Sequence, residues 1–150
     1  MNETTRKNGK LLKAVEMDAY IASKDPLIPV ILLILENGDE FELYNVPLEI
    51  ARFVINGSSI LNGNEKKERI DIFSFIAMHE DILNLIKDDL EKVVIDEYDP
   101  TTMLYTAKVY FRKGKTMLVR RFIPSHAIFL AMIAGKDVYV SERILNIQKN

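Results

Sequence analysis

The chemistry open to this chain is narrow, because few of its residue types are reactive. Among its 150 residues there is no Cys and there are only 2 His. These counts exclude a thiol nucleophile, a disulfide scaffold, a thiolate zinc site and a multi-histidine metal site. The sequence also has no Gly-rich phosphate loop and no nucleophile elbow. Carboxylates and one or two imidazoles are therefore left to carry any acid–base or metal chemistry.

Acidic residues cluster between Glu91 and Asp99, where a strand is expected to end. Carboxylates that converge at a strand end bind hard divalent ions, so Asp96 and Asp99 are candidate ligands for Mg²⁺ or Mn²⁺. Such an ion activates water for cleavage of a phosphodiester bond. The alternative is ordinary turn chemistry, because Asp99-Pro100-Thr101 is also a typical turn sequence.

The two histidines have different predicted environments. His126 follows Pro124-Ser125 at an expected helix start, where the helix dipole disfavours a protonated imidazole. His126 is therefore a candidate general base, and the N–H groups beside Ser125 could receive a phosphate. The alternative is that Ser125 only caps the helix. His79 lies within an apolar stripe of another predicted helix, which favours a buried, hydrogen-bonded histidine or an interface residue.

Basic residues dominate one continuous stretch. Residues 100–136 contain no Asp or Glu and seven Lys or Arg. A hairpin of Leu104–Arg112 and Lys115–Ile123 about Lys113-Gly114 would gather bases and a tyrosine on one face, as in proteins that hold phosphates and stack a base. The expected nucleic-acid contacts are Lys108, Tyr110, Arg112, Lys115 and Arg121. The alternatives are a solvent-facing strand surface, or pairing between subunits with the acidic strand that carries Glu40 and Glu42.

The elements that position these residues follow from hydrophobic periodicity and from Pro and Gly positions. The expected strands are Val15–Ile21, Val30–Glu36, Glu40–Asn45, Glu91–Tyr98, the two of the basic hairpin, and Asp137–Val140. The expected helices are Leu48–Ile55, Ile72–Leu90, one from Pro124 to Gly135, and Glu142–Ile147 capped by Ser141. Asn37-Gly38 is the expected turn of the first hairpin. A polar loop is expected over Ser58–Glu68.

The order strand, hairpin, proline, helix, glycine occurs twice in the sequence. The turn glycine precedes the helix proline by nine residues in one copy (Gly38 to Pro47) and by ten in the other (Gly114 to Pro124). This repeat predicts an α+β fold with a duplicated strand–hairpin–helix unit, in which a mixed sheet is flanked by helices. We expect a flexible tail over residues 1–12 and a single domain over 13–150. A cytoplasmic location without membrane contact is also expected.

Several segments of the second half resemble the bifunctional nuclease domain family. They are Lys92-Val-Val-Ile-Asp-Glu-Tyr98, Leu104-Tyr-Thr-Ala-Lys-Val-Tyr110, Ile123-Pro-Ser-His-Ala-Ile-Phe-Leu-Ala131 and Val138-Tyr-Val-Ser-Glu-Arg-Ile-Leu145. In the first half, Pro29 to Tyr44 resembles the opening hairpin of that family and Pro47 to Gly57 its first helix. The resemblance covers about Lys13 to Leu145. It implies an α+β domain with an internal duplication that is usually oligomeric, and some members cleave both DNA and RNA.

The ionisable positions of that family are substituted in this chain. The Arg before the helix proline is Ile123 here, the Asp after the serine is His126, and the Asp three residues before the proline is Arg121. The His-Asp pair that opens the long helix appears as Phe73-Ser74. The residues that build the helix start are kept, namely Pro124, Ser125, Ala127 and Ile128. An imidazole in place of a carboxylate suits Mg²⁺ poorly.

Two functions follow as expectations. The first is a nuclease that uses a divalent cation on DNA or RNA, with His126, Asp96 and Asp99 as catalytic residues. In that case Ser125 joins the basic hairpin in contacting the nucleic acid. The second is a non-catalytic homo-oligomer, a dimer or larger, that binds nucleic acid or protein.

Overall fold

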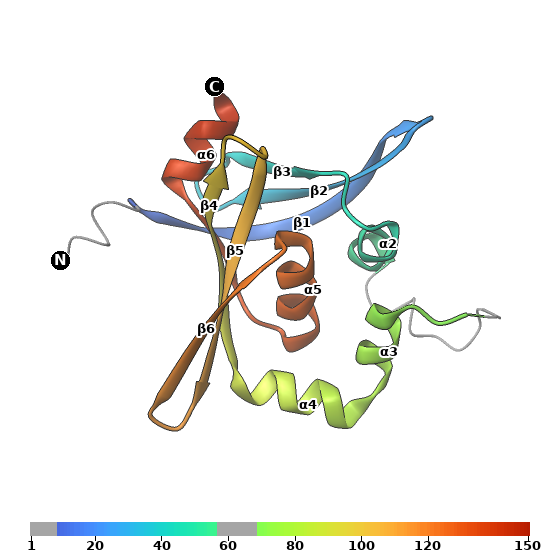
Figure 1. The fold of residues 1–150 in the computed structure, drawn as a ribbon, viewed down its shortest axis with the longest axis vertical. Helices are drawn as coiled ribbons and strands as arrows, with labels where there is room; N and C mark the ends of the chain where they lie inside the picture. Colours follow the sequence, from blue (N-terminus) through green and yellow to red (C-terminus); the bar gives the residue numbers. More distant parts are fainter. Residues whose placement is uncertain (1–8, 57–68) are drawn as a thin grey trace.

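A computed structural model describes residues 9–56 and 69–150. Within these residues, one mixed seven-stranded sheet runs in the order β3-β2-β1-β7-β4-β5-β6 and is accompanied by helices (Figure 1). The strands are β1 (Leu11–Lys24), β2 (Leu27–Leu35), β3 (Glu40–Tyr44), β4 (Leu90–Asp99), β5 (Leu104–Lys113), β6 (Thr116–Phe122) and β7 (Val138–Ser141). The helices are α2 (Leu48–Asn56), α3 (Ile72–Met78), α4 (Glu80–Asp89), α5 (Pro124–Ala134) and α6 (Glu142–Lys149). The predicted α+β class is confirmed.

The same three-stranded unit occurs twice in the sheet. β1, β2 and β3 pair antiparallel in sequence order, and so do β4, β5 and β6. A helix follows each unit, with α2 after Pro47 and α5 beginning at Pro124. β7 joins the units, because it pairs antiparallel with the start of β1 and parallel with β4. The predicted strand–hairpin–helix repeat and mixed sheet are therefore present.

Both hairpin turns differ from the predicted ones by one residue. In the first hairpin, Leu35 N donates to Asp39 O at 2.8 Å, so the loop has three residues and its Gly38 takes φ 90°. In the second, Lys113 pairs with Thr116 and the turn is Gly114-Lys115. Glycine is favoured at the first position of this turn because φ there is 61°.

The predicted long helix over Ile72–Leu90 is wrong. It is interrupted at His79, whose backbone is extended at φ −100° and ψ 104°. His79 is exposed rather than buried, because the break turns it out of the apolar stripe. Its ring lies 4.1 Å from that of Phe75, and its Nδ1 lies 2.7 Å from the Phe75 carbonyl oxygen.

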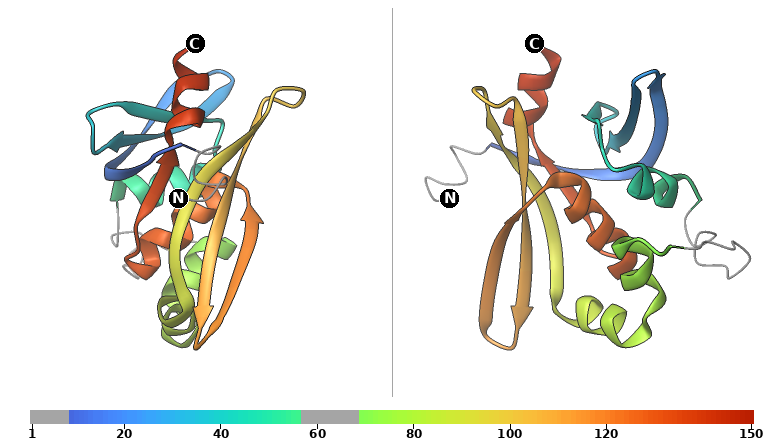
Figure 2. Two further views of the ribbon diagram at one scale, coloured as in Figure 1. Left: turned by 90° about the vertical axis from the view of Figure 1, so that its left-hand side faces the viewer. Right: turned by 45° about the vertical axis from the view of Figure 1, so that its right-hand side comes forward.

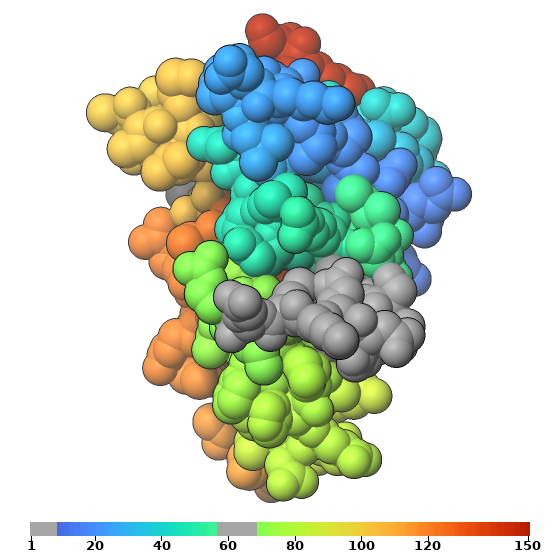
Figure 3. Space-filling view, turned by 90° about the vertical axis from the view of Figure 1, so that its right-hand side faces the viewer, coloured from blue at the N-terminus to red at the C-terminus, as the bar shows by residue number. Residues whose placement is uncertain are grey.

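The core lies between the inner face of the sheet and the helices. Alternate residues of β2 and β3, among them Ile31, Leu33 and Phe41, enter the same buried cluster as residues of α2 and α5. Helix α5 runs through the middle of the molecule and is buried along most of its length (Figure 2). Figure 3 shows the side on which the end of the β1–β2 hairpin, α2, α3 and α4 form the surface.

Three expectations concern the ends and loops of the chain. Most of the predicted tail (residues 1–8) and the predicted polar loop over Ser58–Glu68 lie outside the described residues. The domain begins before residue 13, because Leu11 starts β1 and Leu12 is buried in the core. In the part of the chain that the structure describes, no helix is long and apolar enough to span a bilayer.

Candidate functional site

The candidate metal ligand Asp96 lies in a β-bulge. The pairing of β4 with β5 shifts between Ile95 and Glu97, so Asp96 has no partner residue on β5. Bulges of this kind redirect a side chain. The buried Asp96 carboxylate accepts a hydrogen bond from Lys108 Nζ through Oδ2 at 3.1 Å. Its Oδ1 is buried without a hydrogen-bond partner among the described residues.

Most bases of the predicted basic face form ion pairs within the chain. The Arg121 guanidinium lies 2.8 Å from Glu97 Oε2, and Arg112 Nε lies 3.2 Å from Glu91 Oε1. The register places Lys108 opposite Arg121 rather than opposite Val119, although both residues stay on the predicted face. Tyr110 is on this face too, and Lys92 Nζ lies 4.9 Å from its ring centroid. Three of the bases expected to hold phosphates, Lys108, Arg112 and Arg121, are therefore paired with carboxylates of β4, whereas Lys115 lies in the turn and forms no ion pair with the described residues.

The charge state of Lys108 reflects this pairing. Burial lowers the pKa of Lys108, but the hydrogen bond to Asp96 and the charges of Asp96 and Glu97 outweigh burial and raise the pKa. Lys108 therefore stays an ammonium at neutral pH. Its charge offsets that of Asp96, whose side chain is only 6% exposed.

Asp99 is an ordinary turn residue, which was the alternative to a metal ligand in the sequence-based prediction. It is exposed, and its Oδ1 accepts a hydrogen bond from Thr101 N at 2.9 Å. Among the described residues, no group of three Asp, Glu, His or Cys side chains is placed to hold a metal ion. Since Asp96 binds Lys108 and Asp99 binds a turn amide, this pair does not fit the predicted divalent cation.

The three predicted catalytic residues line no common cavity. Asp99 lines a cavity of about 330 Å³ together with Glu97, Arg121 and Arg143. His126 lines a separate groove of about 770 Å³. Asp96 lines neither of them. Asp99 and His126 therefore line two different cavities, and Tyr98 lines both of them.

The larger cavity, called the groove from here on, forms where both repeats meet. It is lined by residues 42–47 at the end of β3, residues 98 and 103–105 around the β4–β5 turn, residues 123–126 at the start of α5, and residues 147–148 of α6. The segments that lead into the two helix prolines, Pro47 and Pro124, thus share one cavity. Large apolar side chains are exposed around it, namely Tyr44, Met103, Leu104 and Ile123.

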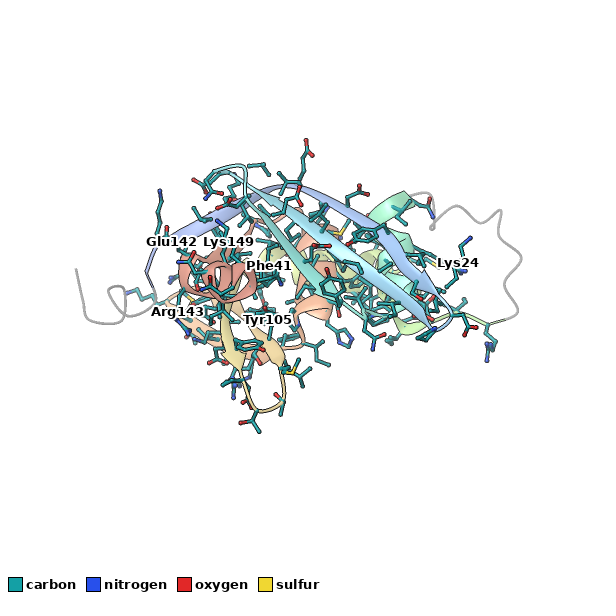
Figure 4. All side chains as sticks on the ribbon, turned by 90° about the horizontal axis from the view of Figure 1, so that it is seen from above. Lys24, Phe41, Tyr105, Glu142, Arg143 and Lys149 are labelled. Atoms are coloured by element: carbon teal, nitrogen blue, oxygen red, sulfur yellow. The ribbon has the colours of Figure 1, made fainter. Side chains whose placement is uncertain are left out.

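Aromatic rings and one glutamine build the wall of the groove beside α6. Tyr105 packs against Tyr98 at 4.7 Å and edge-on against Phe41 at 5.1 Å between ring centroids. Figure 4 shows Phe41 and Tyr105 close together beside α6. Gln148 binds the backbone of Glu42 twice, accepting from its N–H at 2.6 Å and donating to its carbonyl oxygen at 2.7 Å. This pair of bonds ties α6 to β3 and occupies backbone groups at that edge of the sheet.

Helix α5 begins differently from the prediction, in which Ser125 was the candidate N-cap. Ile123 is the N-cap and Pro124 is the first helical residue, so Ser125 lies inside the helix and does not cap it. The side chain of Ile123 supplies no capping hydrogen bond. His126 is half-buried, and its ring meets that of Phe73 edge-on at 5.3 Å. His126 therefore forms part of an apolar wall.

Supplying the missing cap is expected to stabilise the protein. An Ile123→Ser substitution places a hydroxyl where it can accept from the free N–H groups of the first helical turn, because Ile123 already has N-cap geometry at φ −60° and ψ 128°. We expect the free energy of unfolding to rise by about 1 kcal/mol, measured by urea denaturation. An Ile123→Ala control lacks the acceptor, and equal stabilities of the two variants would contradict the capping argument.

Comparison with known proteins adds no relative: no family model matches the chain, and no curated protein matches its sequence. The groove is thus described from its geometry alone. Of the residues that line the groove, Ser125 and His126 were predicted as site residues, whereas Leu104, Tyr105 and Gln148 were not. Local patterns hold no signal for them, because Glu42 and Gln148 are 106 residues apart in the chain.

Proposed function

We propose that this chain is a non-catalytic protein-binding module, and that the groove takes an extended apolar segment of a partner protein. One observation carries this proposal: exposed apolar side chains from three separate segments of the chain converge on a single cavity of about 770 Å³. Apolar side chains that gather around a cavity commonly mark a binding surface. Cytoplasmic location stays a prediction.

The groove lining favours a partner that is apolar and carries a basic residue. Among the residues that the structure describes, Glu42 is the one Asp, Glu, Lys or Arg that lines the groove. A phosphate would therefore have no cation to bind there, whereas a Lys or Arg of a partner segment could approach Glu42. Tyr98 and Tyr105 offer ring faces to aliphatic or aromatic side chains.

A tryptophan-containing peptide tests this proposal. Because the chain has no Trp, the fluorescence of such a peptide reports its own environment. The probe is a short acetylated peptide of alternating Leu and Ser that carries one Trp and one Lys. We expect a saturable blue shift on binding, with affinity in the micromolar range that is typical of small interfaces.

Two matched variants localise that binding. Leu104 in the groove and Leu85 on α4 are both 64% exposed. Leu104→Asp is expected to weaken peptide binding by about tenfold or more, equivalent to about 1.4 kcal/mol, whereas Leu85→Asp leaves it unchanged. Equal effects of the two substitutions, or a peptide that never saturates, would refute the groove as the binding site.

The nuclease function stays a prediction, and the geometry favours the binding module over it. The resemblance to the bifunctional nuclease family and the unpartnered Asp96 oxygen support a nuclease. Against it stand the Lys108–Asp96 pair and the different cavities that Asp99 and His126 line. We expect purified protein to leave labelled single-stranded DNA and RNA intact with Mg²⁺ or Mn²⁺. Cleavage that disappears in an Asp96→Asn/His126→Ala variant would establish the nuclease instead.

A further inference from the structure

A strongly acidic surface covers the outer face of the first repeat. The register aligns Glu16 with Ile34 and Glu40, and Asp18 with Leu32 and Glu42, across β1, β2 and β3. These side chains point away from the core, because the alternate residues Ile31, Leu33 and Phe41 enter it. We call this surface the acidic face: Glu16, Asp18, Glu40 and Glu42 around the half-buried Leu32 and Ile34.

The carboxylates of the acidic face lack cationic partners. Among the described residues, no Lys or Arg forms an ion pair with any of them. Glu42 accepts a hydrogen bond from the Tyr20 hydroxyl, and this bond, assisted by the charge of Glu42, raises the pKa of Tyr20. Two strand spacings of about 4.8 Å each separate the two charges of one row, so these charges lie slightly beyond the screening length of physiological salt, about 8 Å. The negative charge of the acidic face is therefore not offset by cations of residues 9–56 and 69–150.

A surface of the opposite sign lies at the far end of the sheet. β6 is an edge strand, and residues 116–121 are all exposed. Lys113, Lys115 and Arg120 form no ion pair with the described residues, in contrast to Lys108, Arg112 and Arg121. We call one face of the exposed end of this hairpin the basic tip: Lys113, Lys115 and Arg120 around the exposed Leu118. The register places Lys113, Leu118 and Arg120 on the same face of the hairpin.

The two surfaces match in chemistry and cannot meet within one chain. Each has an apolar centre flanked by charges, negative on the acidic face and positive on the basic tip. β3 and β6 are the opposite edges of the sheet, and Figures 1 and 2 show the β5–β6 turn at the opposite end of the molecule from β1, β2 and β3. A partner that satisfies both surfaces therefore has to carry both of them.

We propose that the partner is a second copy of this chain, with the basic tip of each copy on the acidic face of the other. Such reciprocal contacts close into a two-fold dimer rather than an open chain. Each contact buries Leu118 against Leu32 and Ile34 while the flanking charges pair. This inference does not depend on the groove, whose lining shares only Glu42 with the two surfaces.

Charge reversal followed by mixing tests the dimer. One variant carries Glu16→Lys and Glu40→Lys; the other carries Lys113→Glu, Lys115→Glu and Arg120→Glu. In sedimentation velocity at low salt we expect the wild type to be dimeric and each variant alone to be monomeric, with a dissociation constant raised at least tenfold. Their mixture should form a one-to-one heterodimer, because the reversed surfaces now match. About 1 M salt, where the screening length is about 3 Å, should dissociate the wild-type dimer.

The controls separate the proposed contact from general charge effects and from misfolding. A Glu80→Lys/Asp88→Lys variant makes the same net charge change as the first variant, on α4, and should remain dimeric. Far-ultraviolet circular dichroism establishes that each variant is folded, and Glu16→Gln/Glu40→Gln should weaken the dimer without reversing charge. A monomeric wild type at low salt, a dimer that ignores both reversals, or folded variants that fail to associate on mixing would each overturn the proposal.

Discussion

A Lys108→Met substitution is expected to lower the free energy of unfolding by about 3 kcal/mol. The change leaves the Asp96 carboxylate buried with neither oxygen paired to the described residues, since Oδ1 already lacks a partner among them and Oδ2 loses the ammonium. Removing one member of a buried ion pair costs about 3–5 kcal/mol. We place this case at the lower end because the Lys108 side chain is 26% exposed. Urea denaturation at neutral pH measures the loss.

Two further variants show whether the buried charge is the cause. Arg112→Met removes the exposed pair with Glu91, whose side chain is 41% exposed, and should cost about 0.5 kcal/mol or less. The double variant Lys108→Met/Asp96→Leu should recover most of the stability, because an apolar pair replaces the buried charge. If Lys108→Met lowers the free energy of unfolding no more than Arg112→Met does, the Asp96–Lys108 pair does not stabilise the fold as a buried ion pair.

The second large effect is expected at Phe129, at the centre of the helical layer. Phe129 is 1% exposed, and its ring packs edge-on against Phe53 of α2 at 5.1 Å and Phe73 of α3 at 5.3 Å. Phe129→Ala is expected to lower the free energy of unfolding by about 4 kcal/mol, because it leaves a cavity and removes two aromatic pairs. The shift of the urea midpoint at unchanged slope measures this loss.

Phe75 provides the control for that substitution. It lies on α3 but is 41% exposed and contacts the exposed ring of His79. Phe75→Ala should therefore cost about 1 kcal/mol or less. Similar losses at the two positions would mean that Phe129 does not join α2, α3 and α5 as described. Since α5 also supplies Pro124 and His126 to the groove, Phe129→Ala should weaken peptide binding as well.

Much of the fold could be predicted because local signals mark it. Pro47 and Pro124 begin or immediately precede helices, and Gly38, Gly114 and Gly135 occupy positions of positive φ. The one-residue errors in the turns arose because several placements of a glycine in a hairpin are locally acceptable. The break at His79 was missed because the apolar spacing continues through it, and only the packing of α3 and α4 turns the chain there.

The site was predicted less well, because its contacts depend on register and on distant segments. The basic face of β5 and β6 was predicted correctly. Its ion pairs were not, since these depend on which residues of β4 lie beside Lys108 and Arg121. No sequence pattern marks the β-bulge at Asp96. This bulge places the Asp96 carboxylate in a buried position next to Lys108. The groove joins segments from both ends of the chain, from Glu42 to Gln148, so no local pattern reveals it.

The most direct test of the central claim is an amide chemical-shift titration of the labelled full chain with the Trp-containing peptide. The account predicts saturable shifts at residues 43–46, 103–105 and 123–126, together with the side-chain amide of Gln148. It also predicts that Leu104→Asp moves the midpoint of this titration to an at least tenfold higher peptide concentration and that Leu85→Asp leaves the midpoint unchanged. Shifts confined to the β5–β6 hairpin, or no saturable shifts at all, would contradict the groove as the functional surface of this protein.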